Sequence, residues 1–135
     1  MRKVAGFLFL NFWLCWMVSC KKNNESAVDL TGTWAGVFEH IYDTLGPKSV
    51  TLTFSADSFR GESEMSGYPY ICHGNYQVEK DSILFHNLCF SPTFPAWKYE
   101  LDGKYKMIVQ GDSLWIHRLI GDFVYEEEVY SLRKQ

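Results

Sequence analysis

The cysteines and histidines are the residues of this chain whose chemistry depends most on their spacing. The chain has four cysteines, Cys15, Cys20, Cys72 and Cys89, and four histidines that are scattered singly. Cys72 and His73 are adjacent, and adjacent residues of a strand point to opposite faces, so we do not expect them to act together as nucleophile and base. Because no C-x-x-C pair and no spaced Cys/His set occurs, the sequence predicts no metal site.

Motifs of the common enzyme classes are also absent from the sequence. It contains no nucleophile elbow, no H-E-x-x-H and no glycine-rich phosphate loop. We therefore predict that the protein is not an enzyme and that it needs no cofactor.

The first 19 residues have the layout of an export signal. Arg2 and Lys3 form a cationic start, residues 4–18 are almost wholly apolar, and the small Ser19 precedes Cys20. The apolar run is shorter than the about 20 residues that a transmembrane helix needs, and a polar stretch follows it. The sequence therefore predicts a cleaved signal and not a membrane span.

Met17-Val18-Ser19-Cys20 resembles the lipobox of bacterial lipoproteins, with Met where Leu is usual. The resemblance implies that residues 1–19 are removed, that Cys20 is acylated, palmitate included, and that residues 20–28 tether the protein to the membrane. Lys21 is not the Asp of an inner-membrane retention signal, so the resemblance favours the outer membrane, in either leaflet. The alternative is an ordinary secretory signal with Cys20 as a spare thiol.

Charge and length limit the partners and the number of domains. Removing Arg2 and Lys3 from the 13 basic residues leaves 11 against 16 acidic ones, a net charge of −5. A nucleic-acid partner is therefore not expected. Residues 29–135 suit one domain, and a chain of this size buries well over half of its unfolded surface.

The pattern after the tether predicts an all-β fold. Short runs rich in β-branched and aromatic residues alternate with Gly, Asp, Asn and Ser, and no long stretch has helical periodicity. In residues 48–55, for example, Val50, Leu52 and Phe54 share one face. About eight antiparallel strands joined by short turns predict a single up-and-down β-barrel, which has no free sheet edges.

The same pattern predicts a disulfide bond. Once Cys15 has left with the signal and Cys20 is acylated, Cys72 and Cys89 remain in an oxidising compartment, where two cysteines usually pair. A two-residue turn at residues 80–81 places them opposite each other as a non-hydrogen-bonded pair, with Cα atoms about 4.5 Å apart. The alternative is two buried free thiols.

Gly32-Thr33-Trp34 resembles the G-x-W motif of the lipocalins, and the later segments 74–76, 111–114 and 130–134 look like those of the lipocalin-like, calycin-type domains of bacterial lipoproteins. The resemblance implies that Trp34 closes the narrow end of the barrel and that a late basic residue, Arg133, packs over it. The chain departs from the family in being shorter than a typical lipocalin and in lacking the helix after the barrel.

The turns also predict which side chains face the barrel interior. If residues 111–112 and 121–122 are two-residue turns, Arg118 and Glu127 lie inside on neighbouring strands, and Glu126 and Glu128 lie outside. Burying two charges is costly unless they pair. They either anchor a ligand or lie near the barrel mouth, where Arg118 reaches water. The glycines of the interior faces, Gly36, Gly61 and Gly74, either leave volume or mark bends.

The fold and the interior residues together predict a small, mainly apolar ligand held in a pre-formed cavity. The candidate ligand-binding residues are Arg118, Glu127, Tyr105, Met107, Tyr125, Tyr76 and Phe85. The alternative is a protein-interaction module, such as an inhibitor of an envelope hydrolase, which acts through the loops 68–70 and 94–97. A large cavity would favour the first function; a filled barrel with exposed aromatic loop tips would favour the second.

Overall fold

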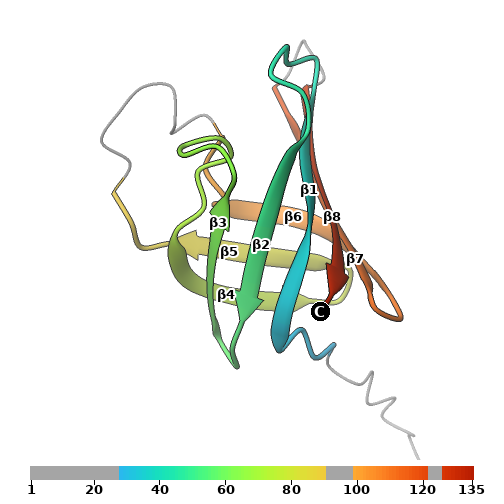
Figure 1. The fold of residues 1–135 in the computed structure, drawn as a ribbon. Coiled ribbons are helices and arrows are strands. Elements are labelled where there is room, and N and C mark those ends of the chain that lie inside the picture. Colours follow the sequence, from blue (N-terminus) through green and yellow to red (C-terminus); the bar gives the residue numbers. More distant parts are fainter. Residues whose placement is uncertain (1–27, 91–98, 122–125) are drawn as a thin grey trace, which may run out of the picture.

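The structure is a closed barrel of eight antiparallel strands that follow one another in sequence order, as predicted (Figure 1). It is a computed structural model that describes residues 28–90, 99–121 and 126–135. The strands are β1 (Gly32–Ile41), β2 (Lys48–Phe54), β3 (Ser58–Ser63), β4 (His73–Glu79), β5 (Ser82–Asn87), β6 (Gly103–Gln110), β7 (Ser113–Ile120) and β8 (Glu126–Lys134). Cys20, Tyr125 and the loop 94–97 lie outside the described residues, so the predictions for them stay predictions.

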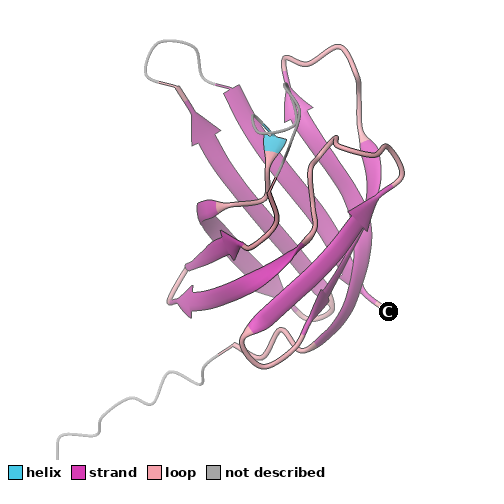
Figure 2. Cartoon of the chain, turned by 90° about the vertical axis from the view of Figure 1, so that its left-hand side faces the viewer, coloured by secondary structure: helices cyan, strands magenta, loops and turns pink. Residues whose placement is uncertain are grey.

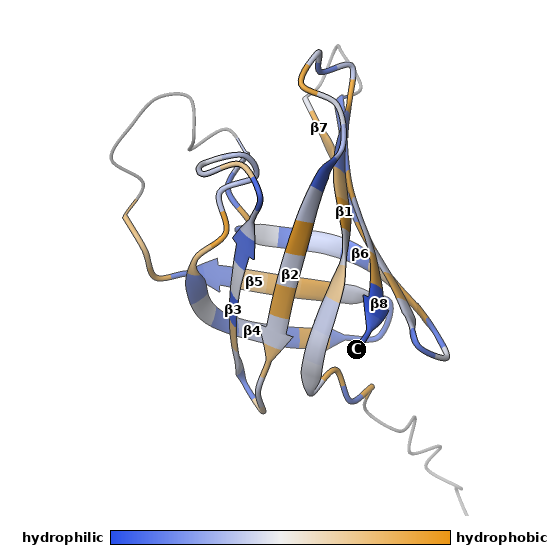
Figure 3. Cartoon of the chain, in the orientation of Figure 1, coloured by the Kyte–Doolittle hydropathy of each residue, from blue (hydrophilic) through white to orange (hydrophobic). Residues whose placement is uncertain are grey.

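Alternation along the strands places the apolar side chains inside. In β2, Val50, Leu52 and Phe54 are buried while the residues between them are partly or fully exposed, and Figure 3 shows the alternation of apolar and polar residues along this strand. Phe54 lies opposite Phe59 of β3, as the sequence predicted.

No helix among the described residues is long and apolar enough to cross a membrane.

The strands form two groups that cross each other. In Figure 1, β4, β5 and β6 run across the direction of the other strands, and Figure 2 shows the same wrapping from the side. Neighbouring strands therefore separate where the groups meet. The β6–β7 ladder runs only from Gln110–Ser113 to Lys106–His117, and the first residues of β6 pair with β5 alone.

Trp34 lies near the start of β1, at one end of the barrel. Its side chain is buried, and its indole Nε1 donates a hydrogen bond of 2.7 Å to the Leu30 carbonyl oxygen. The cation over the ring is Lys134, whose Nζ lies 5.5 Å from the ring centroid. The prediction of Arg133 for this place is wrong, because Lys134 is the Cα partner of Trp34, whereas Arg133, the residue before it, pairs with Ala35.

Two segments between strands cover the opposite end and are called the lid here: residues 64–72 and 99–102. A parallel bridge joins Tyr70 to Glu100, and the Leu101 amide donates a hydrogen bond of 3.0 Å to the Tyr70 carbonyl oxygen. Tyr68 and Leu101 point into the barrel and are 4% and 0% exposed. The prediction that residues 68–70 form an exposed interaction loop is therefore wrong for Tyr68.

The interior glycines mark close approaches of the backbone, which settles the alternative left open by the sequence. A Cβ atom on Gly36 would lie 2.0 Å from the Ser131 carbonyl oxygen of β8, and one on Gly74 would lie 2.0 Å from the His86 carbonyl oxygen of β5. No side chain fits at these distances. Both glycines therefore allow the strands to bend where the barrel closes.

The register of the last hairpin differs from the predicted one. Ile120 pairs with Glu126, so residues 121–125 connect β7 to β8 and the turn is longer than two residues. The resulting shift of three positions exchanges the faces of β8, because side chains alternate along a strand. Glu128, Tyr130 and Leu132 point inward. The predicted inward position of Glu127 and the predicted outward position of Glu128 are wrong.

Candidate functional site

An ion pair lies inside the barrel near the lid. Glu128 is 0% exposed, and its Oε2 accepts hydrogen bonds from Arg118 Nε at 2.7 Å and from the Tyr105 hydroxyl at 3.1 Å. Arg118 and Glu128 are Cα partners on β7 and β8. The sequence predicted an inward Arg118, which is confirmed, but it gave Arg118 the wrong acidic partner.

Arg118 lies where β6 and β7 separate. Its guanidinium carbon lies 4.5 Å from the centroid of the Tyr105 ring. Nη2 donates a hydrogen bond of 3.1 Å to the Glu100 carbonyl oxygen, and Nη1 donates one to the Asp102 carbonyl oxygen. These two hydrogen bonds attach Arg118 to the lid segment 99–102. Arg118 makes them beyond the point where the β6–β7 ladder ends.

Burial controls the electrostatics of this pair. Removal from water raises the pKa of the Glu128 carboxyl above its usual value, although the charge and the hydrogen bond of Arg118 oppose the shift. Burial, followed by the charge of Glu128, raises the pKa of the Tyr130 phenol well above 10. Tyr130 therefore stays neutral at physiological pH. Among the described residues, Glu128 is the one acidic residue that is fully buried in the barrel.

Some polar atoms around the pair have no hydrogen-bond partner among the described residues. They are Glu128 Oε1, the Tyr130 hydroxyl and His40 Nδ1. His40 is 5% exposed, and its Nε2 lies 3.4 Å from Glu126 Oε2. Buried polar groups without partners are rare and costly, so these atoms indicate a place for a water molecule or a polar ligand group. We call His40, Tyr105, Arg118, Glu128 and Tyr130 the polar centre.

Among the described residues, buried side chains pack together through the rest of the interior. Aromatic rings contact one another along the barrel, for example Phe54 with Tyr76 at 5.0 Å and Phe59 with Phe85 at 5.0 Å between centroids. Four of the predicted ligand-binding residues, Tyr76, Phe85, Tyr105 and Met107, are buried in this core as expected. Their side chains occupy the volume in which the sequence predicted a pre-formed cavity.

An open cleft reaches the polar centre from outside. It has a volume of about 360 Å³ and lies where β6 and β7 separate. The buried Tyr105 and Ser82 and the partly buried Arg118 form its inner wall, and Lys104, Lys106, His117 and Leu119 surround its mouth. We call it the β6–β7 cleft. Arg118, whose side chain is 23% exposed, is the link between this cleft and Glu128.

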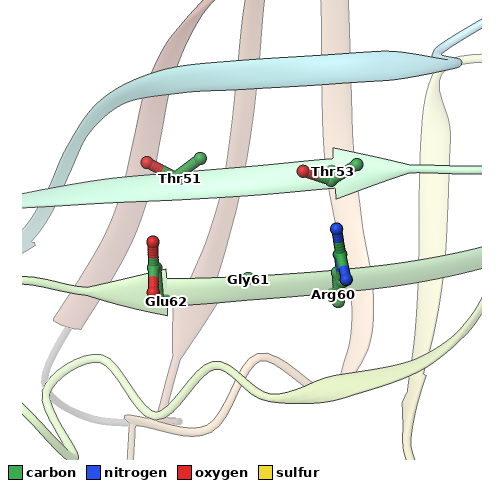
Figure 4. Close-up of a pocket in the computed structure, with 5 residues that line it drawn as sticks. All are labelled: Thr51, Thr53, Arg60, Gly61 and Glu62. Atoms are coloured by element: carbon green, nitrogen blue, oxygen red, sulfur yellow. The ribbon is translucent and has the colours of Figure 1, made fainter.

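A second cleft, on the outer face of β2 and β3, contains only cross-strand pairs. Figure 4 shows Thr51 and Thr53 of β2 beside Glu62 and Arg60 of β3, around a hollow of about 320 Å³. These side chains alternate with the buried ones and face solvent. The arrangement is that of a solvated sheet surface, and it brings no buried polar atom to the cleft.

Glu127 and Tyr125 complete the predicted ligand-binding set, and neither belongs to the site as described. Glu127 points outward, where its Oε1 lies 3.2 Å from His117 Nδ1 at the surface. Tyr125 lies outside the described residues. Sequence reasoning missed Glu128, Tyr130 and His40. A connection of five residues, 121–125, in place of the two-residue turn would have predicted that Glu128 points inward.

The predicted disulfide between Cys72 and Cys89 is present in the structure, with a Cα–Cα distance of 6.2 Å. The hairpin has the predicted register, but its ladder ends at Gly74–Asn87, two pairs short of the cysteines. His73 Nδ1 lies 3.3 Å from Cys72 Sγ and 3.2 Å from Cys89 Sγ. The expectation that Cys72 and His73 point apart is therefore wrong.

The closed eight-stranded barrel is compatible with the lipocalin-like fold that the sequence resembles, and Trp34 is buried near the start of β1. Comparison with known proteins adds no relative, since no family model, no curated protein and no solved structure matches this chain.

Proposed function

We propose that this protein is a lipid-anchored lipoprotein of the outer membrane that binds a small, mainly apolar ligand. The ligand occupies the β6–β7 cleft and places one polar or anionic group against Arg118. The protein acts by binding and not by catalysis. The anchor is the acylated Cys20, which follows from the resemblance of residues 17–20 to a lipobox.

The observation that carries the proposal is the cleft itself. Its volume of about 360 Å³ falls within the range of small-molecule sites. The Tyr105 ring, Leu119 and the methylene stems of Lys104 and Lys106 offer apolar surface, and the guanidinium of Arg118 offers a charged donor. A few polar groups on a mainly apolar wall are typical of sites that orient an amphiphilic ligand.

Charge favours an acidic or acceptor group on the ligand. Lys104 and Lys106 pair with Glu79 and Asp81 at 2.9 Å, but these pairs are largely exposed and their contribution is small. Arg118 is more buried and is held in place by Glu128. A carboxylate or phosphate at the cleft would meet Arg118 inside and two lysines at the rim.

Binding of two fluorescent probes tests the proposal. Dansyl-undecanoic acid has an apolar chain and a carboxylate, and N-phenyl-1-naphthylamine is apolar and uncharged. We expect the acid to bind, and Arg118→Met to weaken its affinity by roughly 10-fold or more, because a hydrogen bond to a charged group contributes about 1.5–3 kcal/mol. The uncharged probe should lose much less.

Lys48→Met is the control for a general loss of positive charge, because Lys48 is on β2 and does not line the β6–β7 cleft. Native mass spectrometry of the protein extracted from its own membrane provides an independent readout, since it detects a retained small molecule directly. Failure of both probes to bind, or equal weakening by the two variants, would refute the cleft as the ligand site.

The second candidate function is a protein-interaction module, and the filled barrel favours it. Tyr42 is 78% exposed at the end of β1 and Phe90 is 87% exposed after β5. Exposed aromatic residues are enriched where proteins bind each other. Replacing Tyr42 and Phe90 by serine would abolish capture of an envelope hydrolase under this function and leave probe binding unchanged.

A further inference from the structure

Three potential metal ligands meet at the open end of the β4–β5 hairpin. The sulfur atoms of Cys72 and Cys89 and Nδ1 of His73 all lie within 4.8 Å of one another. A single imidazole nitrogen contacts both sulfurs, at 3.3 and 3.2 Å. The three atoms therefore surround one point in space, although the disulfide joins two of them.

The backbone fixes these residues independently of the disulfide. The Gly61 amide donates a hydrogen bond of 2.8 Å to the Cys72 carbonyl oxygen, and the Leu88 amide donates one of 3.0 Å to the His73 carbonyl oxygen. The ladder from Gly74–Asn87 to Glu79–Ser82 holds the hairpin below them. Reduction of the disulfide would therefore leave the two thiols and the imidazole close together.

The group is also accessible from solvent. His73 is exposed, the two cysteines are partly exposed, and His73 lines an open cleft of about 390 Å³ together with Arg60 and Leu88. An ion can therefore reach the ligand atoms without unfolding the hairpin.

We propose that Cys72, His73 and Cys89 form a redox-gated site for a thiophilic metal ion such as Zn²⁺. Two thiolates and one imidazole are a ligand set that Zn²⁺ prefers, with about 2.3 Å to sulfur and about 2.0–2.1 Å to nitrogen. The described residues supply three ligands, so water or a substrate takes the fourth position. The disulfide form cannot bind the ion, because its sulfur atoms bond to each other.

The chemistry balances with a dithiol reductant. The reductant gives two electrons and two protons to the disulfide, becomes a disulfide itself, and leaves Cys72 and Cys89 as thiols. Zn²⁺ then binds both sulfurs and releases their two protons to solvent. Reoxidation by a disulfide oxidant moves two electrons from the two zinc-bound thiolates to that oxidant, which takes up two protons and becomes a dithiol. This restores the S–S bond of Cys72 and Cys89 and releases Zn²⁺.

Metal titration of the full-length protein in detergent tests the site. The protein is reduced with a phosphine, which is not a thiol and does not imitate the ligands, and its fold is checked by circular dichroism. Co²⁺ serves as the spectroscopic probe through its thiolate charge-transfer band, and Zn²⁺ as the competitor. We expect one equivalent of metal in the reduced protein and none at this site after oxidation with diamide.

His73→Ala and His86→Ala separate a specific site from ordinary surface binding. Both histidines are exposed, but His86 is on β5 and is not part of the group of three. His73→Ala should weaken metal binding at least 10-fold, and His86→Ala should not. Cys72→Ser reports any binding by other cysteines of the chain.

Three results would overturn the proposal. The first is a reduced protein that is folded but binds no metal. The second is equal binding by the oxidised protein, or by both histidine variants. The third is unfolding on reduction, since the site requires an intact hairpin. The proposal does not depend on the ligand of the β6–β7 cleft, so the two can fail separately.

Discussion

Replacing Glu128 by alanine tests whether a buried ion pair or the surface pair next to it supports the barrel. The change removes the acceptor of Arg118 Nε and leaves the Tyr105 hydroxyl with only its 3.4 Å hydrogen bond to the Glu100 carbonyl oxygen. Removing one partner of a buried pair costs roughly 3–5 kcal/mol. Arg118 is 23% exposed and keeps two carbonyl acceptors, so we expect a loss of about 2–3 kcal/mol in the free energy of unfolding.

Glu127→Ala is the matched control, because it removes the neighbouring carboxylate from an exposed pair. Glu127 and His117 have side chains that are 32% and 36% exposed, and pairs of this kind contribute about 0–1 kcal/mol. Urea denaturation followed by tryptophan fluorescence measures both variants. With an m-value of about 1.5 kcal/mol per molar, the midpoint should fall by roughly 1.3–2 M for Glu128→Ala and by under about 0.7 M for Glu127→Ala.

A larger loss in Glu127→Ala would refute the reasoning and restore the two-residue turn at residues 121–122. Glu128→Gln adds a test of the electrostatics, since glutamine keeps an acceptor oxygen without the charge. The folded pKa of Glu128 is raised by burial, so the folded state holds the proton at pH values where the unfolded chain has lost it.

The free energy of unfolding should therefore fall as the pH rises from about 4.5, the unfolded value, through the folded pKa. Glu128→Gln should remove this part of the pH dependence and be as stable as the wild-type protein, or more stable, at neutral pH. A Gln variant that is strongly destabilised at neutral pH, but not at pH 4, would show that Arg118 outweighs the burial of the charge.

Three further predictions concern the disulfide, the barrel closure and the anchor. Replacing both Cys72 and Cys89 by serine should lower the free energy of unfolding by about 3 kcal/mol under oxidising conditions. The reason is the loss of the disulfide, which closes a loop between residues 17 positions apart; a change below about 0.5 kcal/mol would contradict this. Gly74→Ala should lower the free energy of unfolding by roughly 2 kcal/mol or more, because a Cβ would lie 2.0 Å from the His86 carbonyl oxygen. Gly46 has open space around it, so Gly46→Ala should cost only about 1 kcal/mol, which is due to the left-handed backbone conformation of residue 46. Cys20→Ala should move the folded protein from the membrane to the soluble fraction, and continued membrane association after this change would end the lipoprotein assignment.

The barrel was predictable from the sequence wherever a turn had two residues. Lys80 and Asp81 fix the β4–β5 register, and the disulfide follows from that register. Residues 111–112 fix the β6–β7 register equally well. After Ile120 the same reasoning failed, because Gly121-Asp122 resembles a hairpin turn but belongs to a connection of residues 121–125. Since the shift is an odd number of positions, the acidic residue chosen for the interior was the wrong one.

The other errors occurred outside the regular strands. Alternation predicted that Cys72 and His73 point apart, but β4 begins at His73, so Cys72 lies beyond the part of the chain that alternation governs. Tyr68 was expected at the surface because it follows a glycine and precedes a proline. In the structure it covers the barrel end and contacts Phe38 and Tyr99, at 5.5 and 4.8 Å between centroids. Hydrophobic periodicity carries no information about which irregular segments fold back over a core.

The polar centre relates the stability of the barrel to the binding that we propose. A glutamine at position 128 would keep an acceptor for Arg118 without the cost of burying a charge, so the carboxylate is not the most stable choice for that position. What the carboxylate adds is an ionic bond that fixes the direction of the guanidinium toward the β6–β7 cleft. Glu128→Gln should therefore leave the barrel folded and weaken the binding of the anionic probe. If the ion pair were purely structural, this change would alter the binding of neither probe. A charge that lowers stability and orients a donor at a cleft is what we expect of a binding site.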